Sequence, residues 1–200
     1  MKENYLDFIQ SGKMYNDLAD TLIQTRQTTM RALLTYNNLY GTDEPARKKI
    51  LSDLLGSVGE SAFFELGFRC EFGKHIHIGE RFYSNFDCIL LDGAEIRIGD
   101  DVLFGPRVGI FTTNHAIDPE ERAAGACYAK PVSIGNKVWL GANVTVNQGV
   151  TIGENTIIGS GSVVTKDIPA NVIAVGNPCR ILRTITEADK TDYFSTLMTP

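Results

Sequence analysis

Apolar residues recur every six positions from residue 134 to residue 168, and this spacing predicts the main element of the fold. Each unit of six carries two inward positions, four residues apart. The first is occupied by Ile134, Leu140, Val146, Ile152, Ile158 and Val164, and the second by Val138, Val144, Val150, Thr156, Ser162 and Ile168. A helix would repeat every 3.6 residues, and hairpins would need a turn signal roughly every eight to twelve residues. The pattern therefore predicts short strands joined by tight corners, with each coil stacked on the last.

The same frame extends upstream with interruptions. Phe72, Ile78 and Leu90 keep the first position, polar Ser84 also occupies one such slot, and the second position holds Ile76, Phe82, Cys88 and Ala94. After a two-residue slip the frame resumes, with Ile98, Phe104 and Ile110 at the first position and Val102 and Val108 at the second. The rhythm fails through HAIDPEERAAGACYAKP. We expect a solenoid over residues 61–185 and a functional loop extruded from one corner at about residues 115–131.

The first sixty residues follow a helical pattern instead. Apolar spacing predicts one helix from Asp17 to Asn38, and Thr42-Asp43-Glu44-Pro45 predicts the start of a second helix from Ala46 to Leu55. We expect residues 1–60 to form a helical subdomain that covers the open first coil. Residues 186–200 form a polar tail without a clear signal, and we expect part of it to be disordered.

Composition limits the classes of function. The chain has 200 residues, of which 43% are hydrophobic, so one main domain is expected. No apolar run approaches the roughly 20 residues of a membrane span, and the beginning of the chain does not resemble a signal peptide. Four widely spaced cysteines without a CxxC pair predict free thiols and a cytoplasmic protein. A net charge of −5 argues against nucleic-acid binding.

Several segments carry a resemblance to a known family. They are MYNDLADTL followed by Arg26, then FYSNFDCILLD, then TNHAID, and finally VWLGANVTVNQGVTIGENTIIGSGSVVTKDIPANVIAVGNPCRIL. Together they resemble the maltose and galactoside O-acetyltransferases of the hexapeptide-repeat acyltransferases, over about Gly12 to Arg183. The resemblance implies a left-handed parallel β-helix, a homotrimer, and transfer of an acetyl group from acetyl-coenzyme A to a sugar hydroxyl without a metal.

Two residues match the catalytic positions of that family. A hydroxyl is a poor nucleophile at neutral pH, and His115 matches the histidine that removes its proton. Asn85 matches the asparagine that donates a hydrogen bond to the oxyanion of the intermediate. On spacing alone, His115 could instead be a solvated loop residue and Asn85 a turn residue. None of the four cysteines is adjacent to a histidine in the sequence, so we do not expect an acyl-cysteine.

The resemblance also implies an acceptor pocket. Asp17, Arg26 and Tyr83 match positions that line it, although Asp17 could equally cap a helix and Arg26 could lie on a solvated helix face. Gly93 stands where some galactoside-type members have a second acidic residue, and Cys127 stands where they have a larger apolar residue at the pocket. Both differences point away from galactosides as acceptors.

Coenzyme A is expected along the last coils. The residues that match the family's coenzyme contacts are Trp139, Gly141, Ala142, Gly159, Ser160, Thr165, Lys166, Arg180 and Arg183. The cations suit phosphates, whereas the small residues are also required by the solenoid itself. No Walker or Rossmann motif is present.

Two other functions remain open at this point. Carbonic anhydrases built on the same solenoid bind zinc through three histidines between subunits, and this chain has His75, His77 and His115. A solenoid can also serve as a scaffold without catalysis. The combination of His115, Asn85 and a basic C-terminal cluster favours the enzyme over the scaffold.

Overall fold

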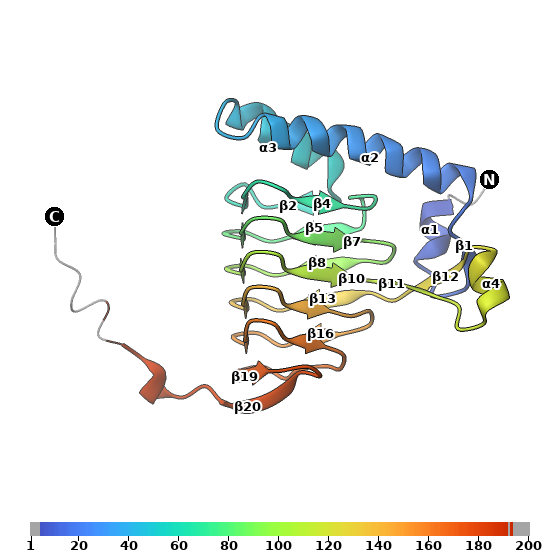
Figure 1. The fold of residues 1–200 in the computed structure, drawn as a ribbon. Helices are drawn as coiled ribbons and strands as arrows, with labels where there is room; N and C mark the ends of the chain where they lie inside the picture. Colours follow the sequence, from blue (N-terminus) through green and yellow to red (C-terminus); the bar gives the residue numbers. More distant parts are fainter. Residues whose placement is uncertain (1–4, 192, 194–200) are drawn as a thin grey trace.

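The computed structural model describes residues 5–191 and residue 193, and shows a parallel β-solenoid of about six turns (Figure 1). The coils stack so that equivalent strands form three parallel sheets. The first sheet contains β2 (Ser57–Val58), β5 (Ile76–Ile78), β8 (Ile96–Ile98), β13 (Val132–Ile134) and β16 (Thr151–Ile152). The second contains β3 (Phe63–Phe64), β6 (Tyr83–Ser84), β9 (Leu103–Phe104), β14 (Trp139–Leu140), β17 (Ile157–Ile158) and β19 (Val172–Val175), and ends with an antiparallel β20 (Arg180–Thr184). The third contains β4 (Arg69–Cys70), β7 (Ile89–Leu91), β10 (Gly109–Phe111), β15 (Thr145–Val146) and β18 (Val163–Val164).

The hexad positions form the core, as their spacing predicts. Inward side chains of successive coils stack in register, as Ile98, Ile134 and Ile152 do along the first sheet. The two polar inward residues of the later coils are buried and satisfied by backbone. Thr156 Oγ1 donates to the Pro169 carbonyl at 2.9 Å, and Ser162 Oγ donates to the Gly159 carbonyl at 2.6 Å. These hydroxyls therefore tie corners together where an aliphatic side chain would leave the carbonyls unpaired.

The upper coils are longer than the lower ones. Twenty residues separate the paired positions Val58 and Ile78, and again Ile78 and Ile98, whereas eighteen separate Ile134 and Ile152. A two-residue insertion therefore occurs also between Cys70 and Ile78. The expectations that Phe72 and Ala94 keep the hexad frame are wrong. Phe72 belongs to this insertion, Ile96 takes the inward position predicted for Ala94, and both residues pack in a separate cluster with Ile9, Tyr15, Leu22, Cys127 and Ala129.

The N-terminal segment lies over the first coil. It consists of α1 (Tyr5–Ile9), β1 (Tyr15–Asn16), α2 (Asp20–Asn38) and α3 (Glu44–Leu54), and α2 lies across the end of the solenoid (Figure 1). Asp17 does not cap α2, because the N-cap residue is Ala19. The second helix starts two residues before the predicted Ala46, since Asp43 caps it by accepting a hydrogen bond from the Ala46 amide at 3.0 Å.

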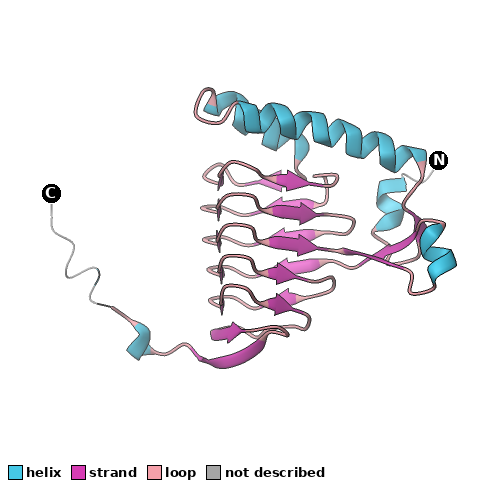
Figure 2. Ribbon diagram, viewed as in Figure 1, coloured by secondary structure: helices cyan, strands magenta, loops and turns pink. Residues whose placement is uncertain are grey.

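The predicted loop is a β-hairpin with a short helix at its tip. β11 (Thr113–His115) pairs with β12 (Ala126–Ala129), and α4 (Pro119–Ala123) connects them (Figure 2). Polar composition predicted an irregular loop here, but Asp118 caps α4 by accepting from the amides of Glu120 and Glu121. β12 of the hairpin also pairs with β1, so the N-terminal segment holds the hairpin in place.

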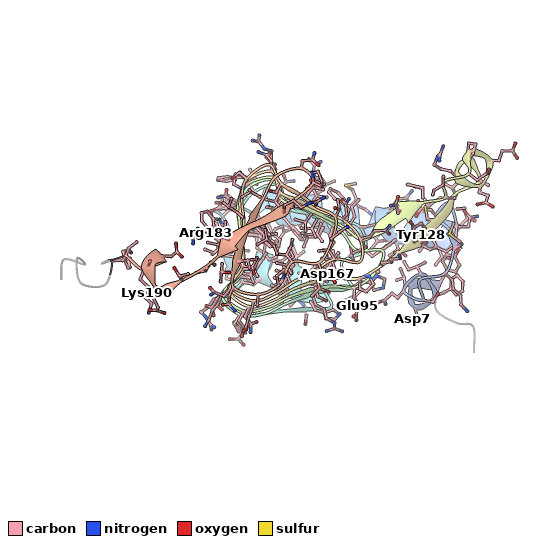
Figure 3. All side chains as sticks on the ribbon, turned by 90° about the horizontal axis from the view of Figure 1, so that it is seen from below. Asp7, Glu95, Tyr128, Asp167, Arg183 and Lys190 are labelled. Atoms are coloured by element: carbon pink, nitrogen blue, oxygen red, sulfur yellow. The ribbon has the colours of Figure 1, made fainter. Side chains whose placement is uncertain are left out.

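The C-terminal segment closes the last coil. β20 runs antiparallel to β19 across the end of the solenoid, where Arg183 is labelled in Figure 3. A 3₁₀ turn, Glu187–Asp189, follows it. The predicted disorder concerns residues 186–200. Of these, residues 192 and 194–200 lie outside the described part of the chain. Within the described residues, no helix is long and apolar enough to cross a membrane.

Candidate functional site

A small antiparallel sheet outside the solenoid carries the candidate active site. β12 is its central strand, with β1 on one side and β11 on the other. The register aligns Tyr15 with Cys127 and Cys127 with His115. Directly opposed residues of an antiparallel sheet point to the same face, so these three side chains form a row. Figure 3 looks along the stacked coils and shows this hairpin, marked by Tyr128, projecting from one corner of the solenoid.

His115 lies at the end of β11 with one ring nitrogen occupied. Its Nδ1 lies 2.9 Å from Cys127 Sγ, and its backbone amide donates to Asn114 Oδ1 at 3.0 Å. The structure shows no hydrogen bond from the other ring nitrogen, Nε2, to any described residue. His115 is exposed, whereas Cys127 is fully buried. The imidazole thus presents Nε2 to the outside while its inner edge rests on a thiol.

The Cys127 thiol is neutral in this environment. Its pKa is raised to about 11, mainly by burial and also by the Asp17 and Glu71 carboxylates, while Arg26 opposes the shift. Cys127 was expected to line the acceptor pocket directly. The structure places its sulfur instead behind His115, in the apolar cluster beneath the hairpin.

Asp17, Arg26 and Glu71 form a charged cluster beside this sheet. Arg26 lies between the carboxylates: it pairs with Asp17 Oδ1, and its Nε donates to Glu71 Oε1 at 2.9 Å. It also donates to the Asp17 carbonyl and lies over the Phe72 ring, 5.2 Å from its centre. The structure therefore brings together Asp17 and Arg26, two of the four predicted acceptor residues.

Glu71 was not identified from the sequence. Its side chain is only 12% exposed, and burial raises its pKa to about 7 although Arg26 opposes the shift. The pKa of Asp92 next to it is also raised by burial, and Asp92 accepts hydrogen bonds from the amides of Glu71 and Phe72. The sequence did show a carboxylate, Glu71, at a corner of the solenoid. It could not show that this carboxylate is buried, because the hexad pattern does not predict that α2 covers the corner.

The corner at Gly93 is crowded, and a side chain at this position would collide with its neighbours. A Cβ on Gly93 would lie 2.2 Å from Thr113 Oγ1 and 3.4 Å from the Tyr15 hydroxyl. Both hydroxyls are buried without a hydrogen-bond partner of standard geometry among the described residues. Burial also raises the pKa of Tyr15, so its phenol stays protonated. Two neutral hydroxyls thus occupy the neighbourhood of the acidic residue that some galactoside-type enzymes carry.

Asn85 and Tyr83 lie at a different corner from His115. Asn85 follows β6 and belongs to a column that runs, one coil at a time, from Glu65 through Asn85, Gly105, Gly141 and Gly159. His115 leaves the opposite edge of the third sheet, after β10. Tyr83 donates from its hydroxyl to Glu65 Oε1 at 3.0 Å. One chain therefore does not bring Asn85 or Tyr83 to His115.

The residues predicted to bind coenzyme A divide between the same two corners. Trp139, Gly141, Ala142, Gly159 and Ser160 lie on or beside the Asn85 column, where Trp139 is half exposed. Thr165 and Lys166 follow β18, at the corner from which the hairpin leaves two coils above. Gly141 is also required by packing, because a Cβ there would lie 2.7 Å from the Ser160 nitrogen.

The two arginines of the predicted coenzyme site are partly engaged within the chain. Arg183 pairs with Asp189, and Arg180 donates to the Cys179 carbonyl at 2.8 Å. Lys166 is exposed, and the structure gives it no ion pair with any described residue. Lys166 is thus free to receive a phosphate, whereas Arg183 would first have to leave its carboxylate.

The three histidines do not meet within the chain. His75 is buried and its Nδ1 bonds the Asp92 carbonyl at 2.7 Å, while His77 contacts Ser57 and Glu95. Among the described residues, no group of three histidine, cysteine, aspartate or glutamate side chains could hold a metal ion. Each histidine thus has separate partners.

A parallel β-solenoid with an extruded, histidine-bearing hairpin defines the class of hexapeptide-repeat acyltransferases. Two family models match this chain: the bacterial transferase hexapeptide (six repeats) over residues 131–166, and the maltose acetyltransferase hexapeptide capping motif over residues 9–59. The second match covers the helical segment that closes the first coil.

Relatives across the whole chain give the same assignment. The galactoside O-acetyltransferase of Escherichia coli K12 is 40% identical over 186 residues, which are 93% of this chain and 92% of that protein. A crystal structure of a maltose O-acetyltransferase from Clostridium difficile 630 is 44% identical, with a TM-score of 0.88 over 91% of this chain and 97% of that one. A galactoside acetyltransferase in complex with coenzyme A is 37% identical, with a TM-score of 0.89 over 100% of both chains. The chain belongs to this family of acetyl-coenzyme A-dependent O-acetyltransferases.

Proposed function

We propose that this protein transfers the acetyl group of acetyl-coenzyme A to a hydroxyl of a sugar, with His115 as the general base. The observation that carries the proposal is the position of His115, whose Nδ1 rests on Cys127 while Nε2 faces outward beside a cluster of sugar-binding residue types. Carboxylates and a guanidinium, such as Asp17 and Arg26, bond readily to hydroxyl groups. The maltose and galactoside enzymes among its relatives support a sugar as the acceptor.

The reaction is a direct transfer in a ternary complex. Nε2 of His115 accepts the proton of the acceptor hydroxyl while its oxygen attacks the thioester carbonyl. The carbonyl oxygen becomes negative in the tetrahedral intermediate and receives a hydrogen bond from the side-chain amide of Asn85. As the intermediate collapses, the carbon–sulfur bond breaks, and the imidazolium returns the proton to the sulfur of coenzyme A. No proton or electron is left over.

This mechanism requires a second copy of the chain. His115 and Asn85 lie at opposite edges of the third sheet, so one chain cannot offer both to the same carbonyl. The hairpin of one copy projects outward from the solenoid (Figure 3). In the proposed assembly it meets the Asn85 column of a neighbouring copy. Such a contact joins two different surfaces, and it closes into a ring when the rotation divides a full turn. We propose a homotrimer with an active site at each of its three interfaces.

The coenzyme lies in this proposal along the same interface. The predicted coenzyme residues occupy both corners, since Trp139 and Ser160 lie near the Asn85 column and Lys166 lies near the hairpin corner. Gly141, Ala142 and Gly159 carry at most a methyl group, so an extended ligand can approach the backbone of the coils closely there. Lys166 would then meet a phosphate near the adenosine.

The acceptor is proposed to differ from a galactoside. Any side chain at Gly93 would require Thr113 to move, so an acidic group at this corner does not fit the present packing. The charged cluster instead offers Asp17, Glu71 and Arg26, and the neutral hydroxyls of Thr113 and Tyr15 lie nearby. This set is typical of a site for a neutral polyhydroxyl compound.

A substrate screen tests the proposal. The purified protein is incubated with acetyl-coenzyme A and a panel of monosaccharides and disaccharides, including glucose, maltose and galactosides, and free coenzyme A thiol is measured. We expect acceptor-dependent thiol release together with an acetylated sugar in the mass spectrum. Release that no sugar stimulates, or transfer to amines only, would contradict a sugar hydroxyl as the acceptor.

A further inference from the structure

The contact between Cys127 and His115 has no counterpart elsewhere in the described chain. Four buried or half-buried cysteines are present, and the other three sulfurs do not contact an imidazole. Cys127 lies on the central strand of the small sheet, aligned with Tyr15 on one side and His115 on the other. Its position is therefore held by backbone pairing on both sides, whereas His115 is exposed at the end of an outer strand.

A neutral imidazole carries one hydrogen, and its position decides whether Nε2 can act as a base. With the hydrogen on Nε2, the outward nitrogen is a donor and cannot accept a proton from the acceptor hydroxyl. With the hydrogen on Nδ1, the Nε2 lone pair is free. An imidazole in water favours the tautomer with the hydrogen on Nε2, so a group that accepts a hydrogen bond from Nδ1 is useful for catalysis.

We infer that Cys127 is a positioning residue for His115: its sulfur accepts the Nδ1 hydrogen, selects the tautomer with a free Nε2, and holds the ring toward the acceptor. The distance of 2.9 Å between Sγ and Nδ1 places the two atoms in direct hydrogen-bond contact. In the reaction, Nδ1 keeps its hydrogen throughout, and only Nε2 gains and loses a proton. Sulfur is a weak acceptor, so the gain comes mainly from orientation.

The same surroundings argue against Cys127 as an acetyl carrier. Its sulfur is fully buried behind the imidazole, and the Asp17 and Glu71 carboxylates add to burial in keeping the thiol protonated. A carrier would need an exposed thiolate that reaches the thioester. Cys127 therefore acts through His115 and does not touch the reacting atoms.

The two simplest substitutions at this position separate positioning from packing. Cys127→Ser keeps a hydrogen-bonding atom opposite Nδ1, whereas Cys127→Ala removes it, and both lose the sulfur from the apolar cluster. For Cys127→Ala we expect kcat to fall about 3- to 10-fold, the range of one hydrogen bond, with the KM values for acetyl-coenzyme A and acceptor little changed. For Cys127→Ser we expect a kcat within about twofold of the unsubstituted protein. A residue that only fills space would give the opposite order, because a buried hydroxyl is costlier than a methyl group.

Histidine nitrogen spectroscopy gives a readout that does not depend on turnover. The chain has only three histidines, so ¹⁵N-histidine labelling and a His115→Gln variant identify the His115 signals. We expect the Nδ1–H tautomer to predominate in the unsubstituted protein and in Cys127→Ser, and the Nε2–H tautomer to gain in Cys127→Ala. Cys88→Ala serves as the control, because Cys88 Sγ faces the Gly105 carbonyl at 3.4 Å instead of a histidine.

The inference rests on the proposed role of His115, and the outcomes distinguish the two. If His115→Gln retains full turnover, the proposed base is wrong. If His115→Gln is inactive but Cys127→Ala keeps the unsubstituted kcat and tautomer, only the role of Cys127 is overturned. Loss of activity in both Cys127→Ser and Cys127→Ala, with an acetylated Cys127 found by mass spectrometry during turnover, would make the thiol a covalent carrier and also overturn the inference.

Discussion

His115 combines an exposed outer nitrogen with an inner nitrogen that is held by a buried thiol. A general base needs this asymmetry, because one nitrogen must be accessible to substrate while the other is restrained. His77 offers the natural comparison, since it is half-buried on a solenoid strand and contacts Ser57 and Glu95. Two histidines of one chain thus have different surroundings that predict different roles.

Replacing His115 by alanine tests this difference at the level of one residue. We expect kcat of His115→Ala to fall by a factor of about 10² to 10⁴, the usual contribution of a general base, without loss of coenzyme A binding or thermal stability. His77→Ala is the matched control and should retain most of the activity. Steady-state kinetics and a coenzyme A binding titration provide the measurements, and equal turnover in the two variants would exclude His115 as the base.

Glu71 predicts a specific pH dependence of stability. Its pKa is raised from an ordinary 4.5 to about 7, so in this range the folded chain holds a proton that the unfolded chain has released. Folding is therefore destabilised as pH rises from about 4.5 to about 7, by on the order of 3 kcal/mol in total, and the penalty is constant above that range. In Glu71→Gln this fall should become shallower. Thermal unfolding at pH 5, 6, 7 and 8 provides the measurement, and identical pH profiles for the two proteins would contradict the buried carboxyl.

Lys166 predicts how the coenzyme is recognised. If this exposed cation meets a phosphate, Lys166→Ala should raise the apparent KM for acetyl-coenzyme A about 3- to 10-fold at low ionic strength and leave the KM for the sugar unchanged. The difference from the unsubstituted protein should shrink at higher ionic strength, because salt screens the contact that the mutation removes. Lys137→Ala, a substitution of another exposed corner lysine, is the control. Dephospho-coenzyme A, which lacks the 3′-phosphate, identifies the group that Lys166 meets. An equal loss for both forms of the coenzyme in Lys166→Ala would mean that this residue does not contact the 3′-phosphate.

At the scale of elements, the strands are too short to be stable by themselves. Most contain two or three residues, so each coil depends on the backbone bonds and the inward side chain of the next. The first coil has no coil above it, and α2 and α3 take that place. Arg47 of α3 links these elements, because its buried guanidinium donates to the Tyr36 hydroxyl of α2 and to the Phe64 carbonyl of β3, both at 2.8 Å.

Removing this link should destabilise the cap more than the solenoid. Arg47→Leu leaves the Phe64 carbonyl without its donor and removes the stacking on the Tyr36 ring, 4.4 Å away. We expect a loss of about 1.5 to 3 kcal/mol, the range for hydrogen bonds to charged groups. Arg47→Lys keeps the charge but has no planar fork, so it should rescue only part of this loss. Chemical denaturation gives the values, and protection of α2 amides in hydrogen exchange locates the change. A full rescue by lysine would mean that charge alone matters.

At the scale of the whole molecule, the predicted site residues lie along two separate edges of one sheet. His115, Asp17, Arg26 and Lys166 belong to one edge, and the Asn85 column with Trp139 belongs to the other. A closed ring of copies brings unlike edges together at every interface. The proposed homotrimer therefore predicts that activity depends on assembly.

Mixing two inactive variants tests the shared site. His115→Ala retains Asn85, and Asn85→Ala retains His115. An interface to which the first variant contributes Asn85 and the second contributes His115 therefore contains both groups. After joint unfolding and reassembly in equal amounts, about one site in four should contain both groups, because the two required neighbours each occur with a probability of about one half. Each variant alone should stay nearly inactive. No recovery in mixed assemblies, with recovery in a parallel mixture containing unsubstituted protein, would place both groups in one chain.

The sequence by itself determined the solenoid and its core. A six-residue period requires backbone that turns at each corner, and the inward residues of residues 134–168 are buried as that period predicts. Local signals also predicted the covering helices, because amphipathic spacing and the Asp43 cap act within one turn. The family resemblance carried the assignment to O-acetyltransferases, which the comparisons confirmed.

Only the tertiary structure decided which of these residues meet. Cys127 and His115 lie twelve positions apart in a stretch that looked irregular, and they touch because β12 pairs with β11. Glu71 acquired its raised pKa because α2 buries its corner, although Arg26 of the same helix opposes the shift. The separation of Asn85 from His115 likewise follows from the stacking of coils. Periodicity specifies which side chains point inward, but contacts between distant segments depend on how those segments pack, which no local pattern records.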